Sequence, residues 1–437
     1  MTDTHPAPPH ARPLPGGLPT PTGLGTSAAR LVTEAPAPQD VPAEQAPAVA
    51  DAPGQEETAA PPPVPDPPDG FPALPGWPSG LGTSAARLAA QLAQPPAEAP
   101  AVPEPGYADR AWGDGTATPL YCPVTERVDD VLADEVDERL VAWAAECGFP
   151  DEELDQIRKT RFGRLVTLAH PDCADPDRLL VAAKLNAAWW AADDLYADDT
   201  ALGATPTELP ERLTLAMAAM DPVPPAGEFT RELDKTLAGD RVLVALGSAV
   251  EHLTRYATPA QVQRVCYSTF AMFVSWTAYA AWKHTEQSPP AWKYLAARQH
   301  DSFYTSMTVI DVLGGYELPA NLYYEPRARR AAFWAGTASV LVNDLHSVTK
   351  DLADENPPCN MVLQIAADRD CSIDEATEAT VELHNNVVRD FQALHRELQA
   401  VPSPELHRFL RGLQSWMGGG FEWHATNPRY RTQPATT

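Results

Sequence analysis

The sequence lacks the features of membrane and secreted proteins. Nowhere in its 437 residues is there an uninterrupted run of about 18 apolar side chains, so no membrane-spanning helix is expected. The N-terminus, MTDTHPAPPH, has neither the basic nor the apolar segment of a secretory leader. The six cysteines lack CxxC spacing, and a chain of this size does not need disulfides. We therefore expect reduced thiols in a cytoplasmic protein.

Basic charge is also scarce. The chain has 32 Lys and Arg against 59 Asp and Glu, a formal net charge of −27. Such a charge repels nucleic acid phosphates and anionic membrane surfaces, so neither is an expected partner. A small polyanionic substrate would need local cations or metal ions at its site. The sequence does not specify an oligomeric state, and a homodimer is compatible with it.

The first part of the chain has few residues that could form a core. Residues 1–110 hold 26 of the 47 prolines, with much Ala and Gly and almost no aromatic residues. This composition buries too little apolar surface to offset the entropy of ordering, which predicts a disordered tail over residues 1–112. The tail contains GLGTSAARL twice, at 23–31 and 80–88. The repeat is either a duplication within a low-complexity linker or a short recognition segment.

Patterns typical of strands are almost absent from residues 113–437, which we predict to form a single all-α helical domain. Apolar residues recur there at helical spacing. Asp175 with Pro176 marks one helix start, and Gly148 with Pro150 marks one helix end. The other helices are expected at 151–164, from 210 onward, and at 229–255, 259–285, 290–313, 326–354, 374–399 and 404–424.

An acidic cluster, DDLYADD, follows an apolar helical segment at residues 193–199. Four carboxylates in seven residues repel one another, and a helix C-terminus adds an unfavourable dipole interaction. Asp194 and Asp198 share a helix face, with Asp193 close by, which suits hard divalent cations. Considered alone, the cluster also fits a solvated acidic helix end.

A second polar stripe lies in NDLHSVTKD at residues 343–351. Asn343, Ser347 and Asp351 are four residues apart, so a helix places an amide, a hydroxyl and a carboxylate oxygen in one row. All three are hard oxygen ligands for a metal ion. The alternative is an exposed polar stripe, which the preceding apolar run, ASVLV, makes less favourable.

Together the two motifs resemble the paired metal-binding signature of class I terpene cyclases, and the resemblance covers the whole predicted helical domain. Prenyl-chain-elongating synthases instead carry a second aspartate-rich motif, which this sequence lacks. The resemblance implies a helical bundle that ionises an allylic diphosphate with three Mg²⁺ ions. It implies that the metal ligands are Asp193, Asp194, Asp198, Asn343, Ser347 and Asp351.

The resemblance extends to single residues. Arg298 stands about 45 residues before Asn343, at the place of the family's diphosphate-sensing arginine. Asp301 and Ser302 match the linker and effector residues that trigger ionisation. Arg429 and Tyr430 match a C-terminal pair that binds the diphosphate, to which Lys350 is expected to contribute.

Two departures from the family pattern occur in the motifs. Three residues rather than two separate Asp194 from Asp198, so either Asp198 or Asp199 is the ligand. Asp351 stands where glutamate is commoner, and it keeps the carboxylate.

The long leader, DDLYADD, PLYCPVTERVDD and NDLHSVTKD also resemble the 2-methylisoborneol synthases of actinobacteria. That subgroup implies a reaction in which 2-methylgeranyl diphosphate is cyclised and water is captured, giving 2-methylisoborneol and diphosphate. The alternatives are a sesquiterpene cyclase acting on farnesyl diphosphate and a non-catalytic helical interaction protein.

A carbocation requires a dry cavity with polarisable walls, which aromatic side chains supply through cation–π attraction. Each aromatic residue is individually more typical of ordinary core packing. We expect Tyr196 and Trp416 to be the most favoured wall residues. The further candidates are Trp189, Phe273, Trp276, Phe303 and Trp334.

Overall fold

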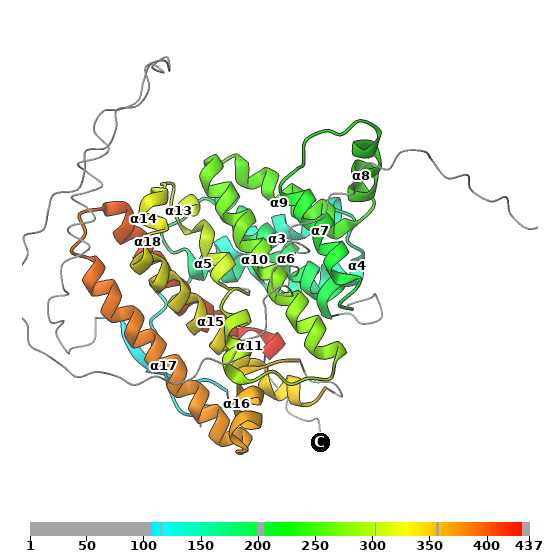
Figure 1. Ribbon diagram of the computed structural model, residues 1–437. Helices are drawn as coiled ribbons and strands as arrows, with labels where there is room; N and C mark the ends of the chain where they lie inside the picture. Colours follow the sequence, from blue (N-terminus) through cyan, green and yellow to red (C-terminus); the bar gives the residue numbers. More distant parts are fainter. Residues whose placement is uncertain are drawn as a thin grey trace, which may run out of the picture. The chain divides into compact units, whose positions relative to one another are not determined.

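The computed structural model describes residues 106–113, 115, 117–198, 205–301, 303–354 and 358–430, without the side chains of Asp198 and Arg429. These residues form a helical bundle (Figure 1), which confirms the all-α prediction. In the described ranges, no helix is long and apolar enough to cross a membrane. Residues 1–105, with both copies of the repeat, lie outside the described residues.

The longest helices are α3 (Asp130–Glu146), α6 (Pro176–Ala192), α10 (Pro259–His284), α15 (Pro326–Leu352), α17 (Ile373–Leu398) and α18 (Pro404–Thr426). The shorter helices are α4 (Asp151–Thr160), α5 (Phe162–Ala169), α7 (Leu209–Met220), α8 (Glu228–Ala238), α9 (Arg241–Thr254), α11 (Ala291–Arg298), α12 (Phe303–Ser306), α13 (Ile310–Leu313), α14 (Ala320–Tyr323) and α16 (Met361–Arg369). Irregular turns are η1 (Asp193–Asp198), η3 (Met307–Val309) and η4 (Pro428–Tyr430).

Side-chain caps define where several helices begin. Asp175 accepts a hydrogen bond from the backbone of Asp177 at the start of α6, as the Asp-Pro signal predicts. Ser372 and Glu375 form a capping box at the start of α17. Each cap satisfies backbone N–H groups that have no partner within the helix.

Three predicted helices are interrupted in the structure. The segment 151–164 breaks at Arg161, whose φ of 57° is left-handed. The segment 229–255 breaks before α9, where Asp240 accepts from the backbone of Val242. The segment 290–313 divides into α11, α12 and α13. Apolar residues resume soon after each break, which is why the predictions joined the segments, although Gly239 with Asp240 and the polar run RQHDS at 298–302 are local signals of an interruption.

A short antiparallel sheet precedes the helices and was not predicted. Strand β1 (Tyr107–Arg110) pairs with β2 (Leu120–Pro123). The Tyr107 ring stacks on Tyr121 with centroids 5.2 Å apart. Arg110 forms an ion pair with Glu422 on α18 at 2.5 Å. The ordered fold therefore begins before residue 113, where the sequence placed its start.

Two deletions test where the folded part begins. Removing residues 1–105 is expected to leave the melting transition and the activity near those of the full chain, because that segment is poor in core-forming residues. Removing residues 1–112 also deletes β1 and the Arg110–Glu422 pair, so the melting temperature should fall. Equal melting temperatures for the two truncated proteins would contradict a structural role for β1.

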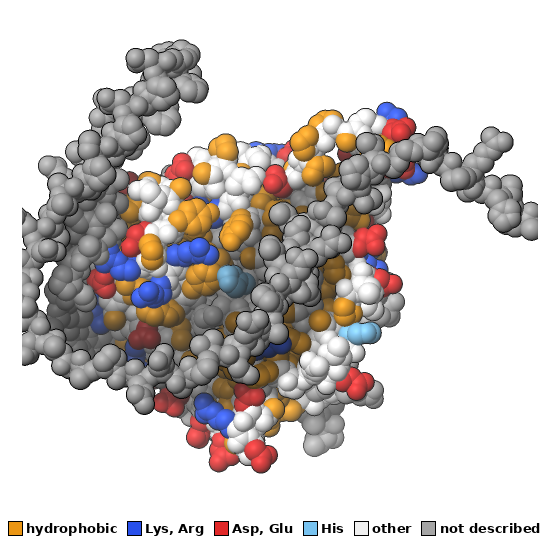
Figure 2. Space-filling view, viewed as in Figure 1, with side chains coloured by type: hydrophobic (Ala, Val, Ile, Leu, Met, Phe, Trp, Pro, Cys, Tyr) orange, Lys and Arg blue, Asp and Glu red, His pale blue; other side chains and the backbone are white. Residues whose placement is uncertain are grey.

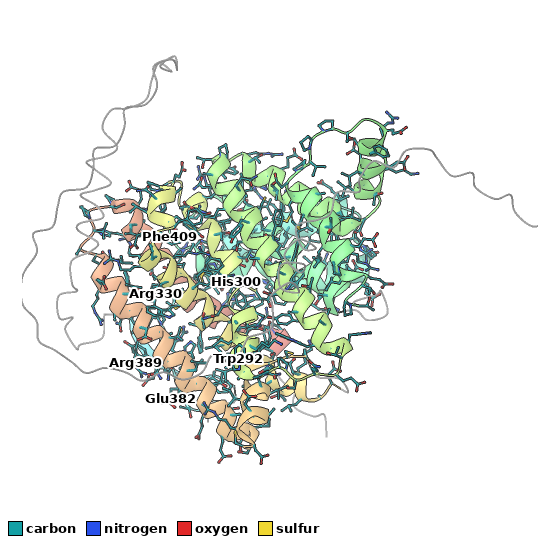
Figure 3. All side chains as sticks on the ribbon, in the orientation of Figure 1. Trp292, His300, Arg330, Glu382, Arg389 and Phe409 are labelled. Atoms are coloured by element: carbon teal, nitrogen blue, oxygen red, sulfur yellow. The ribbon has the colours of Figure 1, made fainter. Side chains whose placement is uncertain are left out.

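The C-terminal helices pack around α15, which contacts both α17 and α18. The amphipathic α17 turns Glu382 and Arg389 outward (Figure 3). Charged and apolar side chains are interspersed on the face shown in Figure 2. Helix α18 approaches α5 closely because Gly419 has no side chain: a Cβ there would lie 2.4 Å from the Leu168 carbonyl oxygen.

A buried histidine on α17 makes stability depend on pH. His384 is 1% exposed, and burial lowers its pKa to about 4 despite a contact with Asn385. In the unfolded chain the His384 imidazole has its ordinary pKa of about 6.5, so between about pH 4 and 6.5 the unfolded chain binds more protons than the folded chain. The contribution of His384 to stability is therefore fully present above about pH 6.5. This contribution is lost as the pH falls towards 4, and the total decrease in the free energy of unfolding is about 3 kcal/mol.

Urea unfolding at pH 7 and pH 4.5 measures this effect. The His384→Gln variant should lose less stability on acidification than the unsubstituted protein. His284→Gln, at an exposed position on α10, serves as the control and should behave like the unsubstituted protein. Equal losses in all three proteins would contradict the assignment.

Candidate active site

A cavity of about 430 Å³ lies between α6, α10, α11, α12 and α15, with η4 at its edge. Charged and polar side chains contribute one part of its wall, namely Asp193, Asp194, Arg298, Asp301, Asn343, Asp344, Ser347, Lys350, Asp351 and Tyr430. Aromatic and apolar side chains contribute another part, among them Trp189, Met272, Trp276 and Phe303.

The acidic motif follows α6 in the π-helical turn η1, where hydrogen bonds span five residues rather than four. A wider turn accommodates the additional residue that separates Asp194 from Asp198. Asp193 is half-buried, Asp194 is exposed, and both line the cavity. The Asp198 side chain and Asp199 lie outside the described residues.

The second motif lies on α15, where Asn343, Ser347 and Asp351 line the cavity as one stripe. Ser347 Oγ donates to Asp351 Oδ2 at 2.7 Å. Asn360, just before α16, donates through Nδ2 to Ser347 Oγ at 3.1 Å and to Asp351 Oδ2 at 2.9 Å. These contacts hold the last two oxygen donors together on the helix face.

Arg298 ends α11 at the centre of an ionic cluster. Its Nη1 donates to Asp301 Oδ2 at 2.8 Å, and its Nη2 donates to Asp344 Oδ1 at 2.8 Å. Burial alone would lower the pKa of Arg298, but the charge of Asp344 raises it well above its usual value. Tyr294 OH also donates to Asp344, at 2.9 Å. The guanidinium is therefore held charged at the cavity wall.

Three neighbours fix which way the Asn343 amide points. Its Oδ1 accepts from Arg298 Nη2 at 2.8 Å, and an arginine can only donate. His424 Nδ1 lies 2.7 Å from the Gly420 carbonyl, so Nδ1 carries the proton and Nε2 accepts from Asn343 Nδ2 at 3.1 Å. Asn343 Nδ2 also donates to Tyr430 OH at 3.1 Å. The amide oxygen therefore points towards Arg298.

Most of the polar residues predicted from the sequence are gathered at this cavity. Asp301 is 5% exposed and accepts from Trp276 Nε1 at 3.0 Å. Lys350 is exposed and lines the cavity, as does Tyr430 on η4. Ser302 and the Arg429 side chain lie outside the described residues. The roles of all these residues remain predictions.

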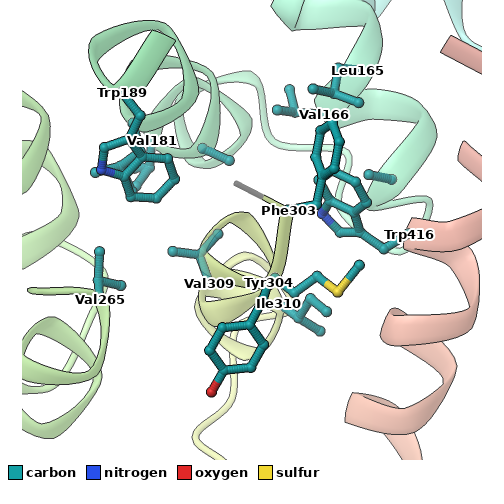
Figure 4. Close-up of a cluster of buried hydrophobic side chains, with 14 of the residues drawn as sticks. Leu165, Val166, Val181, Trp189, Val265, Phe303, Tyr304, Val309, Ile310 and Trp416 are labelled. Carbon is teal, nitrogen blue, oxygen red and sulfur yellow. The ribbon is translucent and has the colours of Figure 1, made fainter. Parts of the chain in front are cut away.

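The aromatic residues are arranged differently from the expectation. Trp189, Trp276 and Phe303 line the cavity. Trp416 does not: it lies behind Phe303, with ring centroids 5.4 Å apart (Figure 4).

Tyr196 faces away from the cavity, and its hydroxyl donates to Asp240 Oδ2 at 2.5 Å. Tyr196 is two residues after Asp194, and residues two apart on a helix point to nearly opposite faces, so Asp194 lines the cavity while Tyr196 packs against Asp240. Phe273 and Trp334 are also absent from the described cavity wall.

Several residues that build the site were not predicted from the sequence. Asp344 lies within the second motif, but its buried contact with Arg298 depends on α11. Asn360 and His424 reach the motif from separate segments. The Tyr279 hydroxyl is buried without a hydrogen-bond partner among the described residues, and its side chain lines the cavity. The sequence does hold a signal for Asp344, which lies beside Asn343 in NDLHSVTKD, but none for the contacts that Asn360 and His424 make with that motif.

The donor set fits hard divalent cations such as Mg²⁺. Two aspartates from η1 and an amide, a hydroxyl and a carboxylate from α15 line the same cavity. Within the described ranges, no three His, Cys, Asp or Glu side chains converge as a ready-made metal cluster. Mg²⁺ characteristically binds one or two carboxylates and completes its shell with water and substrate phosphate, which is consistent with this arrangement.

Comparisons with known proteins agree with this chemistry. Residues 184–390 match the family described as terpene synthase family 2, C-terminal metal binding. A 2-methylisoborneol synthase of Streptomyces ambofaciens is 35% identical over 353 residues, which are 80% of this chain and 79% of that protein. One of Streptomyces griseus is 34% identical over 384 residues, 84% of each chain.

A solved structure shares the fold. It is the 2-methylisoborneol synthase of Streptomyces coelicolor A3(2) in complex with Mg²⁺ and 2-fluoroneryl diphosphate. It superposes with a TM-score of 0.70 at 35% identity, over 74% of this chain and 99% of that one.

Proposed function

This chain belongs to the terpene synthase family, and from that premise we propose that it cyclises 2-methylgeranyl diphosphate and captures water to release 2-methylisoborneol and diphosphate. The observation that supports this most is the placement of two oxygen-rich motifs, from η1 and α15, on the wall of one cavity with Arg298. The substrate is suggested by the relatives, which carry that activity in their names.

The polar end of the cavity suits the diphosphate. Arg298, Lys350 and Tyr430 line it and would donate hydrogen bonds to phosphate oxygens, joined in the proposal by Arg429. Three Mg²⁺ ions held by Asp193, Asp194, Asp198, Asn343, Ser347 and Asp351 would neutralise the diphosphate and favour loss of the leaving group. Asp301 would orient Arg298 through their 2.8 Å contact, with Ser302 beside it in the chain.

The remaining wall suits the hydrocarbon. A trans-configured chain cannot close into the ring directly, so diphosphate returns to C3, the bond rotates, and a second ionisation precedes closure. Trp189, Trp276 and Phe303 place aromatic rings beside the cation, where their negative faces attract positive charge. Trp416, which packs against Phe303, would support that ring from behind. A volume of about 430 Å³ lies near the lower end of the range for ligand cavities, which favours a short chain.

A product assay tests the proposal. The purified chain is mixed with Mg²⁺ and, separately, geranyl, 2-methylgeranyl or farnesyl diphosphate, and products are identified by gas chromatography with mass spectrometry. We expect 2-methylgeranyl diphosphate to have the highest kcat/KM and to give the bicyclic alcohol. One methyl group is worth about 1–3 kcal/mol of discrimination, so geranyl diphosphate should react more slowly and less cleanly.

The assay also separates the alternatives. A preference for farnesyl diphosphate would replace the proposed substrate and leave the cyclase assignment intact. A folded protein that is inactive with all three diphosphates would instead favour a non-catalytic helical interaction protein.

A further inference from the structure

Two buried polar side chains lie on the cavity wall at a distance from the diphosphate end. Asn186 on α6 and Ser306 at the end of α12 both line the cavity, and they are 7% and 4% exposed. Ser306 Oγ donates to Asn186 Oδ1 at 2.7 Å. Because an α-helix rises 1.5 Å per residue, Asn186 lies roughly 10 Å along α6 from Asp193.

The surroundings of this pair are aromatic. Trp189 follows Asn186 by one helical turn, and Phe303 precedes Ser306 by about one turn. Both rings line the same cavity. Met272 on α10 adds another apolar group to the wall. Burying polar groups in such a wall is costly unless they are hydrogen-bonded, so this pair requires a physical reason.

The pair retains hydrogen-bonding capacity. Asn186 Nδ2 donates one of its two hydrogens to the Ala182 carbonyl at 2.9 Å, and Ser306 uses its only hydrogen on Asn186. One N–H of Asn186 and the lone pairs of Ser306 Oγ are left for a further group. A water molecule can accept the first and donate to the second, and buried waters typically have two to four polar partners.

We propose that Asn186 and Ser306 hold the water molecule that captures the final carbocation, and so determine whether an alcohol or a hydrocarbon is released. This inference rests on the proposed function. The water oxygen gives a lone pair to the cationic carbon and forms the C–O bond. The resulting oxonium loses its proton to the diphosphate set free by ionisation. Without the held water, the released diphosphate takes a proton from a carbon next to the cationic centre, and the C–H electron pair forms the double bond of an alkene.

The test measures the ratio of products. The full chain, Ser306→Ala and Asn186→Leu are each incubated with Mg²⁺ and 2-methylgeranyl diphosphate in ¹⁸O-labelled water, and alcohol, hydrocarbon and released diphosphate are quantified. Losing one of two hydrogen bonds to the water should lower the alcohol-to-hydrocarbon ratio about tenfold. Diphosphate release should persist in both variants, and the alcohol of the unsubstituted protein should carry ¹⁸O.

A neighbouring hydroxyl pair provides the matched control. Ser268 Oγ and Thr305 Oγ1 are buried and lie 2.9 Å apart, and neither lines the cavity. Ser268→Ala removes one buried hydroxyl beside α12, as Ser306→Ala does, yet should leave the product ratio unchanged. If the role of Ser306 were purely structural, Ser306→Ala and Ser268→Ala would both lower stability, and neither would change the product ratio.

Three results would overturn the proposal. An unchanged alcohol-to-hydrocarbon ratio in both Ser306→Ala and Asn186→Leu would do so while leaving the proposed function intact. An alcohol without ¹⁸O would exclude water as the source of its oxygen. If the unsubstituted protein formed no alcohol from any allylic diphosphate, the proposed function and this inference would both fail.

Discussion

Replacing Asn343 by alanine is expected to lower kcat/KM by about 10²–10³-fold, the loss typical of removing one preorganised group that stabilises a leaving anion. The amide oxygen faces Arg298 and the cavity, and His424 and Tyr430 hold it there. Stability should fall by only about 1 kcal/mol, because Arg298 keeps Asp344 and Asp301 as partners. Steady-state kinetics over a Mg²⁺ series and thermal melts measure the two effects.

Asp194→Asn should give a loss of similar size, since it keeps the shape of the side chain but removes one negative charge from the exposed end of the acidic motif. Thr349→Ala, at an exposed position on the same helix as Asn343, provides the control and should retain normal kinetics. Near-normal rates in both Asn343→Ala and Asp194→Asn at saturating Mg²⁺ would refute the assignment of the two motifs to the metal site.

The largest loss of stability is expected from Asp311→Ala on α13. Asp311 is fully buried and pairs with Arg264 at 2.6 Å, while its Oδ2 accepts from the backbone of Leu318 at 3.0 Å. Arg264 is 5% exposed and also stacks over Tyr323. Removing the carboxylate leaves the guanidinium buried without its counter-charge, which costs about 3–5 kcal/mol.

Asp172→Ala supplies the comparison. Asp172 pairs with Arg408 at 3.3 Å, but both side chains are exposed, so its loss should cost about 0–1 kcal/mol. Urea unfolding of the two variants at neutral pH measures the difference. If Asp311→Ala were no less stable than Asp172→Ala, the buried pair would not contribute to stability as inferred.

The helical architecture could be predicted because it depends on local signals. The period of apolar residues and caps such as Asp175 act within one or two helical turns, and the structure confirms the helical class and the start of α6, although three predicted helices are interrupted. The positions of Asn343, Ser347 and Asp351 on one face of α15 could be predicted for the same reason. Their assignment to a metal site also depended on resemblance to a family.

The break at Arg161, the strand β1 and the direction of Tyr196 depended on features that the apolar period does not encode. Arg161 adopts its left-handed conformation between α4 and α5, and the Tyr196 hydroxyl donates to Asp240, which lies on a distant segment of the chain. Strand β1 is too short to show alternation, and it is held by Tyr121 and by Glu422 on α18.

The sequence by itself determined the helical class and the two oxygen-rich motifs, because spacing along a helix determines which side chains share a face. The candidate diphosphate-binding residues came from the resemblance to a family. Only the tertiary structure decided which residues surround the cavity. Arg298, Asn343 and His424 come from three separate helices, and their hydrogen bonds exist only when those helices pack together. Trp416 and Asn186 show the same limit: both are buried, yet only Asn186 lines the cavity, since packing alone decides which buried groups face an open space.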